Sequence, residues 1–466
     1  MSIATNLLYW GDNLPLLRDF PPECIALIYL DPPFNSKRDY NVIFHDETGS
    51  APPAQIKAFS DTWKWHMAVD AYKEIISQGG MVSKLLGAMH DAIGPNDVMA
   101  YLSMMALRLK ELHRVLSPGG SLFLHCDPTA SHYLKLLLDA LFGKNNYRNE
   151  IIWHYRKWPS GKAQLQRNHD IIFYYSKTES KERYFQAHMM ERTASTLKRF
   201  GTKKIISGYD EEGKRIPSKM SGEDSPGVWG DDVWDIPRIP PIKQRYETQK
   251  PPALLKRIIE SASKEGQIVL DPFAGCGTTI VEAHRANRKW IGIDITYWAI
   301  HTIIEFMTDE YGTIDIPVIG RPTTIDEAIR LADMDTNKFE QWAVLLVGAI
   351  PTGGKPVDGE ITFVDDDNLQ RKRIIVEVTS GKPNKKHFDA FMNHVKSADM
   401  GIYVVLHKPS KGMIGDAKLL GEYHSKGWEQ KYPKLQIIEI ADLLKGIKPL
   451  LPPQYKKRGK GTSLDI

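Results

Sequence analysis

The sequence is poor in cysteine and has almost no excess of one charge. Its three cysteines, Cys24, Cys126 and Cys276, lie far apart in a chain of 466 residues, and their spacing matches neither a metal site nor a disulfide framework. They predict a reducing, cytoplasmic setting. Lysine and arginine together number 61, and aspartate and glutamate 57. This small difference does not identify a nucleic-acid-binding protein.

Long hydrophobic runs are also missing. No uninterrupted apolar segment approaches the roughly 20 residues that cross a bilayer, and the N-terminus lacks a basic segment followed by an apolar core. We therefore expect a soluble protein with no membrane partner. Hydrophobic residues make up 42% and charged residues 25% of the chain, as in ordinary folded proteins. At about 150 residues per domain, the length predicts two or three domains.

Four short apolar runs predict the strands of a sheet. Helical stretches separate them, and this alternation is typical of an α/β fold with buried parallel strands. We expect one mostly parallel sheet, assembled from both ends of residues 1 to about 310. The runs are residues 24–30, 121–125, 267–271 and 290–294.

Residues 270–279 place two glycines, Gly275 and Gly277, between a predicted strand and a predicted helix. Glycine there lets the backbone pass close to a ligand, where bulky side chains would block the approach. Asp294, at the end of the next strand, can accept hydrogen bonds from both ribose hydroxyls of an adenosyl group. A tight turn with a surface acid is the alternative for a lone glycine pair, and the lysine of a phosphate-binding P-loop is missing. The whole run predicts an adenosyl ligand.

A second motif, Asp31-Pro32-Pro33-Phe34, follows the first predicted strand. Asp31 and a proline carbonyl can accept the two hydrogens of an exocyclic amine, and Phe34 offers a flat surface for a base removed from its stack. Drawing the hydrogens toward acceptors localises the lone pair of the amine, which can then attack an activated methyl group in line. An ordinary proline turn is the alternative for this motif alone. Its combination with the glycine-bearing run favours catalysis.

Taken in this order, the two motifs resemble the beta arrangement of DNA amino-methyltransferases, in which the catalytic motif precedes the cofactor motif. The chain is similar in particular to the modification subunits of type III restriction systems and their solitary relatives. The resemblance covers residues 1 to about 310 and implies a Rossmann-like, S-adenosylmethionine-dependent methyltransferase fold. The supporting segments are residues 9–14, 124–128, 149–153, 232–235 and 248–251.

The resemblance also implies how the cofactor, S-adenosyl-L-methionine, is held. One acid contacts its adenine, an aromatic residue packs beside that ring, and an acid and a threonine line the methionine end together with a lysine and a proline. These residues are, in this order, Asp12, Phe273, Asp271, Thr278, Lys250 and Pro251. For Asp127 we expect only the role of a structural hydrogen-bond acceptor.

The implied activity is site-specific transfer of a methyl group to adenine N6 in double-stranded DNA after base flipping. The enzyme would act in a restriction-modification system or as a solitary methylase. Family members with aspartate before Pro-Pro mostly methylate adenine, and those with serine mostly methylate cytosine N4. Asp31 therefore favours adenine, with cytosine N4 as the alternative.

Residues 156–204 carry twelve lysines or arginines against four acids, with aromatic residues between them. This pattern suits phosphate neutralisation and stacking against an unpaired base. The stacking candidates are Tyr155, Trp158, Tyr174, Tyr175 and Tyr184. We place target recognition in residues 156–247, inserted in a catalytic domain of residues 1–320. A solvated basic surface is the alternative, and nothing in the segment distinguishes DNA from RNA.

Residues 321–450 resemble the Mrr-like branch of the PD-D/E-x-K nuclease fold, a small α/β restriction-endonuclease-like domain. The resemblance implies that Glu340, Asp358 and Glu377 hold a divalent ion, and oxygen ligands suit Mg²⁺. The lysine expected two residues after the last acid is Thr379, which breaks the pattern, with Lys382 and Lys372 as substitutes. We expect a degenerate DNA-binding or docking domain. An active nuclease, and hence a bifunctional methyltransferase and nuclease, is the alternative.

Residues 451–466 are polar and partly basic, and we expect a flexible tail. The expected partners are double-stranded DNA and, by resemblance, a second copy of the chain or a separate restriction subunit. A module that recognises DNA without turnover is the remaining alternative to an enzyme, and the two intact motifs argue against it.

Overall fold

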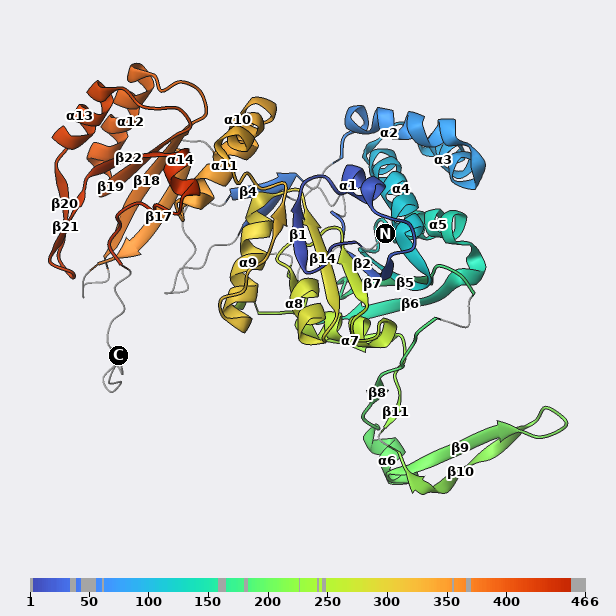
Figure 1. The fold of residues 1–466 in the computed structure, drawn as a ribbon. Coiled ribbons are helices and arrows are strands. Elements are labelled where there is room, and N and C mark those ends of the chain that lie inside the picture. Colours follow the sequence, from blue (N-terminus) through green and yellow to red (C-terminus); the bar gives the residue numbers. More distant parts are fainter. Residues whose placement is uncertain are drawn as a thin grey trace, which may run out of the picture.

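The computed structural model is shown in Figure 1. No helix in the part of the chain that it describes combines the length and hydrophobicity of a membrane span. The described residues are 3–33, 39–42, 56–60, 63–157, 165–179, 183–225, 227–240, 243–244, 249–353, 356–365 and 370–453.

A nine-stranded sheet forms the centre of the first 320 residues, in the order β12-β6-β7-β5-β2-β13-β14-β1-β15. β7 runs antiparallel to both of its neighbours, and the other pairs are parallel. The predicted mostly parallel sheet, built from both ends of this region, is confirmed. Its strands are β1 (Leu7–Trp10), β2 (Ile25–Leu30), β5 (Leu116–Cys126), β6 (Tyr147–His154), β7 (His169–Ser176), β12 (Val233–Asp235), β13 (Ile268–Asp271), β14 (Lys289–Asp294) and β15 (Val318–Ile319).

Helices cover both faces of this sheet (Figure 1). Alternate residues of β2 show why its sequence is apolar throughout: Leu27 and Tyr29 join one hydrophobic cluster, and Ile28 and Leu30 join the other. Burying each such side chain contributes about 1.5–3 kcal/mol. The helices are α1 (Asn13–Asp19), α2 (Trp65–Gln78), α3 (Gly80–Ile93), α4 (Asp97–Val115), α5 (Ser131–Phe142), α7 (Pro252–Ala262), α8 (Thr278–Arg285) and α9 (Tyr297–Tyr311), with a short 3-10 turn at Lys144–Asn146.

β5 begins earlier than its apolar run predicts. α4 ends at Val115, and the Ser-Pro-Gly-Gly segment after Leu116 is already part of the strand. The pairing register of β5 with β2 shifts between Ile25 and Leu27. Such an irregularity accommodates proline and glycine in a strand.

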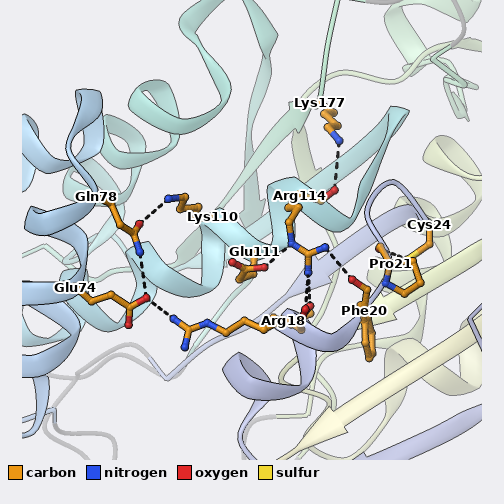
Figure 2. A network of polar contacts seen from close by, with 11 residues as sticks. Arg18, Phe20, Pro21, Cys24, Glu74, Gln78, Lys110, Glu111, Arg114 and Lys177 are labelled. Carbon is orange, nitrogen blue, oxygen red and sulfur yellow. Dashed lines mark hydrogen bonds and ion pairs between the residues drawn. The ribbon is translucent and has the colours of Figure 1, made fainter.

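A polar network holds α1 against α4 (Figure 2). Arg114, in the last turn of α4, donates to the carbonyl oxygens of Leu17 (2.6 Å) and Phe20 (2.8 Å) at the end of α1. The Leu17 carbonyl also accepts from the N–H of the cap residue Phe20 (3.1 Å), so Arg114 adds to the capping at the end of α1. Arg18 pairs with Glu74 of α2 at the exposed side of the same network.

An arm, residues 189–229, projects from the sheet below α7 in Figure 1. It consists of two antiparallel ribbons joined by a short helix. Its elements are β8 (Met189–Met190), α6 (Ala194–Phe200), β9 (Lys203–Tyr209), β10 (Arg215–Asp224) and β11 (Val228–Trp229). A further hairpin joins β3 (Asp39–Val42) and β4 (Ile56–Ser60).

The C-terminal part forms a second, five-stranded sheet in the order β16-β17-β18-β19-β22, with antiparallel pairing at β16 to β18 and parallel pairing beyond. Its core continues into that of the first sheet, because Trp342 of α11 and Ile303 of α9 belong to one cluster. The elements are α10 (Ile325–Met334), α11 (Thr336–Leu346), β16 (Ile350–Pro351), β17 (Gly359–Val364), β18 (Arg371–Thr379), α12 (Lys385–Ser397), β19 (Met400–Val405), α13 (Lys411–Leu419), β20 (Glu422–Ser425), β21 (Gln430–Pro433), β22 (Leu435–Glu439) and α14 (Ile440–Leu444).

Candidate active site

A cavity of about 620 Å³ lies where four parallel strands, β1, β2, β13 and β14, end at one edge of the large sheet. This is the edge at which ligands bind in open α/β sheets, and the volume is that of a small-molecule site. The cavity brings together most of the predicted residues. Those that line it are Asp12, Asp31, Pro33, Lys250, Asp271, Phe273, Gly275, Thr278 and Asp294.

Four predicted residues do not line the cavity in the described structure. Pro32, Pro251 and Gly277 are absent from its walls, and Phe34 lies outside the described residues. Pro251 instead begins α7 as its N-terminal cap residue.

Glycine is needed at the two loop positions for different local reasons. Both have left-handed backbones, with φ of +52° at Gly275 and +80° at Gly277. A Cβ atom at Gly277 would lie 2.7 Å from Ile303 Cγ1, whereas one at Gly275 would meet only a carbonyl oxygen at 4.0 Å. Gly277 therefore lets the loop pack against α9, and Gly275 leaves the cavity wall open.

Asp294 is held in place by its own loop. Its Oδ2 atom accepts a hydrogen bond from the Gly275 N–H (2.9 Å), and its Oδ1 atom accepts from the Thr296 N–H and hydroxyl (2.9 Å each). Burial raises the pKa of this carboxyl group. The Ile295 backbone N–H also interacts with this carboxylate, so groups of its own loop engage most of the roughly four acceptor sites of a carboxylate. Contact with both hydroxyls of a ribose would require the Thr296 hydroxyl to turn away.

Asp271, at the end of β13, is 2% exposed and accepts a hydrogen bond from the Phe273 N–H (3.0 Å). Burial, together with the nearby Asp31 and Asp294 carboxylates, raises its pKa to about 7. The cavity is thus rimmed by acids.

Asp12 caps the N-terminus of α1, accepting from the Leu14 N–H (3.0 Å). It also accepts from the buried Arg108 of α4 (2.7 Å), which donates a second hydrogen bond to Asn13 (2.7 Å). Asn13 donates in turn to the carbonyl of Pro272 (2.7 Å) in the glycine-bearing loop. These contacts join three distant segments of the chain around the cavity.

Arg108 and Asn13 were missed by the sequence reasoning, although both line the cavity. The available signal was one arginine inside an apolar helix, between Leu107 and Leu109. An ionised group on a buried face needs a partner, and here it has three: Asp12, Asn13 and the Met104 carbonyl (3.0 Å).

Asp31 follows β2 and faces two cationic or titratable groups. Lys250 Nζ contacts its Oδ2 atom, and His125 Nδ1 lies 3.9 Å from its Oδ1 atom. Lys250 was predicted at the methionine end of the cofactor pocket. The structure places it on the cavity wall and against the predicted catalytic carboxylate at the same time.

Asp127 has the structural geometry expected of it. Its Oδ1 atom accepts from the N–H groups of Thr129 (3.0 Å) and Ala130 (3.2 Å). It therefore shapes the turn that leads into α5.

The tyrosines predicted to stack on a base are mostly core residues, which corrects that expectation. Tyr174 and Tyr175 lie on β7, at 3% and 0% exposure, and Tyr155 is 4% exposed. Tyr174 stacks on Phe123 with ring centres 4.4 Å apart. A central strand is buried on both faces, so its aromatic residues belong to the core. Trp158 lies outside the described residues.

In the C-terminal sheet, Asp358 Oδ2 accepts from the Val378 N–H (2.8 Å), and Glu377 Oε1 lies 2.9 Å from His387 Nε2. Burial and the charge of Asp358 raise the pKa of Glu340 to about 7 and that of Glu377 to about 8. Across the described ranges, no group of three or more His, Cys, Asp or Glu side chains is arranged to hold a metal ion. The predicted Mg²⁺ site is therefore not supported.

A family model for DNA methylases, covering N6 and N4 methyltransferases, matches residues 25–305. The chain belongs to this DNA methylase family. The match begins at β2 and ends in α9, so it includes both motifs that border the cavity. The predicted family and class of enzyme are confirmed, and the family includes enzymes for both kinds of amine.

Three characterised DNA methylases show the breadth of the similarity. The chain is 27% identical to the DNA adenine methyltransferase YhdJ of Escherichia coli K12 over 291 residues, which is 61% of this chain and 76% of the relative. It is 28% identical to the type II methyltransferase M.BamHI of Bacillus amyloliquefaciens (62% and 54%). It is 25% identical to the Mod subunit of the type III restriction-modification enzyme StyLTI of Salmonella typhimurium (61% and 50%). The chain thus spans about half the length of the last two relatives.

Among solved structures, the cytosine-N4-specific PvuII DNA methyltransferase matches with 14% identity and a TM-score of 0.38, over 73% of this chain and 93% of that protein. A complex of M1.HpyAVI with S-adenosylmethionine matches with 15% identity and a TM-score of 0.35, over 64% and 98%.

Proposed function

We propose that this DNA methylase transfers a methyl group from S-adenosylmethionine to adenine N6 in double-stranded DNA, after the base is flipped out of its stack. One observation carries the proposal: a single cavity joins Asp31 to the glycine-bearing loop and Asp294, although these segments are far apart in the sequence. An acceptor for an amine and a pocket for an adenosyl ligand thus meet at one place.

The residues present fit the cofactor. The open wall at Gly275 suits an adenosyl group, and Asp294, Phe273 and Asp12 border the same space. Acids around the cavity favour a ligand with a positive centre. Lys250 is placed to receive a carboxylate from the methionine end. When bound, the cofactor supplies an activated methyl group.

Asp31 would orient the target amine by accepting one of its hydrogens, so that the nitrogen lone pair points at the methyl carbon. Orientation of this kind supplies much of an enzyme's rate enhancement. Lys250 now occupies Oδ2 of this carboxylate, so the amine must share it with the lysine or displace the lysine. The preference for adenine rests on the aspartate before Pro-Pro and on the similarity to an adenine methyltransferase. Cytosine N4 is the alternative.

The test is incubation of the purified protein with methyl-labelled S-adenosylmethionine and unmethylated bacterial DNA, followed by mass spectrometry of the nucleosides. We expect labelled N6-methyladenine. Labelled N4-methylcytosine would contradict the choice of base, and no label despite cofactor binding would contradict turnover. Unmethylated RNA in a parallel reaction tests the choice of polymer.

For target recognition we propose that the arm contacts DNA, within the inserted region 156–247 of a catalytic domain of residues 1–320. Lys203 and Lys204 of the arm already pair with acids across its hairpin. Lys198 and Arg199, in the last turn of α6, are the better candidates for phosphate contacts. Replacing both with alanine should weaken DNA binding and reduce the salt dependence of the affinity by about 1–2 in slope.

For residues 321–450 we propose a degenerate nuclease-like domain that docks or binds DNA, followed by a tail of residues 451–466. Two contacts support this. Thr379 stands at the expected lysine position and donates to the Tyr403 hydroxyl (2.8 Å), and Glu377 is engaged by His387. We expect no Mg²⁺-dependent cutting of plasmid DNA. Cutting that Glu377→Ala abolishes would contradict the proposal and favour a bifunctional enzyme.

Partners beyond DNA are also proposals. The similarity to a Mod subunit favours a place in a restriction-modification system, with a separate restriction subunit, and a homodimer is expected from the family resemblance. Light scattering of the purified chain, alone and with DNA, measures the number of copies directly.

A further inference from the structure

Behind Asp31 lies a polar side chain that the methyl transfer described above does not use. His125, on β5, is fully buried. Its Nδ1 atom lies 3.0 Å from the Tyr29 hydroxyl and 3.9 Å from Asp31 Oδ1. Its Nε2 atom lies 3.4 Å from Asp170 Oδ2. The imidazole therefore lies between the predicted catalytic carboxylate and a second carboxylate.

The neighbours of the ring determine which of its nitrogens carries the hydrogen. Burial alone would raise the pKa of Asp170, but hydrogen bonds from His125 and Tyr155 lower it to about 2. Asp170 is then ionised at neutral pH and can only accept, which places the hydrogen on Nε2. Burial and the Asp31 carboxylate raise the pKa of Tyr29 well above its usual value. The phenol therefore keeps its hydrogen and donates it to Nδ1.

Methyl transfer leaves a proton to be removed from the amine. As the nitrogen bonds to the methyl carbon, the bond from that carbon to sulfur breaks, and its electron pair stays on sulfur. The nitrogen carries a positive charge until one of its hydrogens leaves as a proton. Asp31 is placed to take this proton, after which it can no longer serve as an ionised acceptor for the next amine.

We propose that His125 is a positioning residue that takes this proton from Asp31, with Asp170 stabilising the imidazolium that forms. This rests on the proposed methyltransferase function and extends it. The Tyr29 hydroxyl turns from donating to accepting as Nδ1 gains the proton. The imidazolium then donates from both nitrogens, and Asp31 is again ionised. When the product leaves and water enters the cavity that Asp31 lines, the proton passes from His125 through Asp31 to water.

The geometry suits such a relay. A carboxylate behind an imidazole stabilises the imidazolium in serine protease triads. The 3.9 Å between Asp31 and Nδ1 is longer than a hydrogen bond, and catalytic contacts of this kind often shorten when the substrate binds. Because His125 is buried, the attraction between its imidazolium and the Asp170 carboxylate is stronger than it would be in water.

All elements packed around the imidazole contribute to its surroundings. Trp153 of β6 covers its edge, with ring centres 5.5 Å apart, and brings no titrating group. Ionisable groups that face the ring or act on its partners include Tyr29 and Asp31 from β2 and the loop after it, Asp170 from β7, Lys250 against Asp31, and Tyr155 against Asp170. Asp271 and Cys276, from β13 and the loop after it, act on Tyr29.

The test measures methyl transfer over many turnovers as a function of pH in wild type and His125→Asn, because the relay returns Asp31 to its ionised form for the next amine. We expect the wild-type rate to fall at low pH, where the imidazole is already protonated. The His125→Asn rate at neutral pH should be about 10²-fold lower, without that fall. His154→Asn is the matched control, because His154 pairs with Asp235 on the same sheet but is partly exposed and lines no part of the cavity. It should keep the wild-type rate and profile.

Asp170→Asn distinguishes a role of His125 in proton transfer from a role in packing. It is also the test variant if His125→Asn fails to fold. Its amide oxygen can still accept from Nε2, but it lacks the charge that stabilises the imidazolium. The rate should fall, and the acid limb of the profile should move to lower pH. A wild-type rate in His125→Asn would overturn the proposal, as would a slower enzyme with an unchanged pH profile. A wild-type enzyme that transfers no methyl group would instead overturn the proposed function.

Discussion

The cavity at the large sheet and the C-terminal sheet with its helix α11 both gather acids, but they hold those acids differently. Around the cavity, Asp12, Asp31 and Asp294 each accept from a donor fixed by another segment. In the C-terminal part, burial and repulsion between neighbouring acids raise the pKa values of Glu340 of α11 and Glu377 of β18 to about 7 and 8. A fixed donor keeps an acid oriented, whereas burial and a neighbouring acid raise its pKa, as they also do at Asp271 beside the cavity.

Removing the donor that holds Asp12 should cause the largest loss of stability among the changes considered. Arg108→Leu leaves Asn13 and Asp12 without their buried partner, and should lower the free energy of unfolding by about 3 kcal/mol. Denaturant unfolding measures the loss. Arg18→Leu is the control, because its pair with Glu74 is about 40% exposed (44% and 39%) and should contribute under about 1 kcal/mol. Equal losses in the two variants would contradict the role given to the buried arginine.

Alanine at each of the two glycines tests how the loop that positions Asp294 is held. Gly277→Ala combines a left-handed backbone with a clash against Ile303, and should cost about 1–3 kcal/mol of stability. Gly275→Ala has open space around its Cβ, so its loss of stability should be smaller, about 1 kcal/mol.

The two glycine variants should differ most in their affinity for the cofactor product. Titration calorimetry with S-adenosylhomocysteine should show a weaker affinity for Gly275→Ala, because the new methyl group occupies the cavity wall. The affinity of folded Gly277→Ala should be close to that of wild type. The reverse order would contradict the division between packing and ligand contact.

The acids of the C-terminal sheet predict a smaller, pH-dependent effect. A glutamate with a raised pKa of about 8 in the folded state binds more protons than in the unfolded chain. The contribution of Glu377 is therefore present at low pH and is lost as the pH rises from about 4.5 through 8. Glu377→Gln stays neutral and should be more stable than wild type at pH 8, on the order of 1 kcal/mol after solvent screening.

Thermal unfolding across this pH range measures the slope for both proteins. Glu360→Gln, on the neighbouring strand and paired with Arg373, should leave the slope unchanged. Glu340 and Asp271, with raised pKa values of about 7, should leave part of the slope in Glu377→Gln. A slope as steep as that of wild type would contradict the raised pKa of Glu377.

Much of the fold follows from local patterns in the sequence. The apolar runs that form β2, β5, β13 and β14 are buried on both faces. Such burial requires apolar residues at successive positions, which can be seen in the sequence. The glycine-bearing loop and Asp31 were found because each is a short segment that leaves a core strand.

What could not be predicted depends on pairs that are distant in the sequence. Arg108 lies 96 residues from Asp12, and His125 lies 45 residues from Asp170. Neither pair has a local signal, since only the folded sheet brings them together. Tyr174 and Tyr175 were misread for the same reason, because a basic neighbourhood in the sequence concealed a central strand.

The central claim is that Asp31 contacts the target amine, whereas the glycine-bearing loop binds the cofactor. It is tested most directly by measuring cofactor affinity and methyl transfer on one preparation of Asp31→Ala. We predict transfer reduced by at least about 10²-fold, with an affinity for S-adenosylhomocysteine close to that of wild type. Equal loss of binding and transfer would contradict the claim.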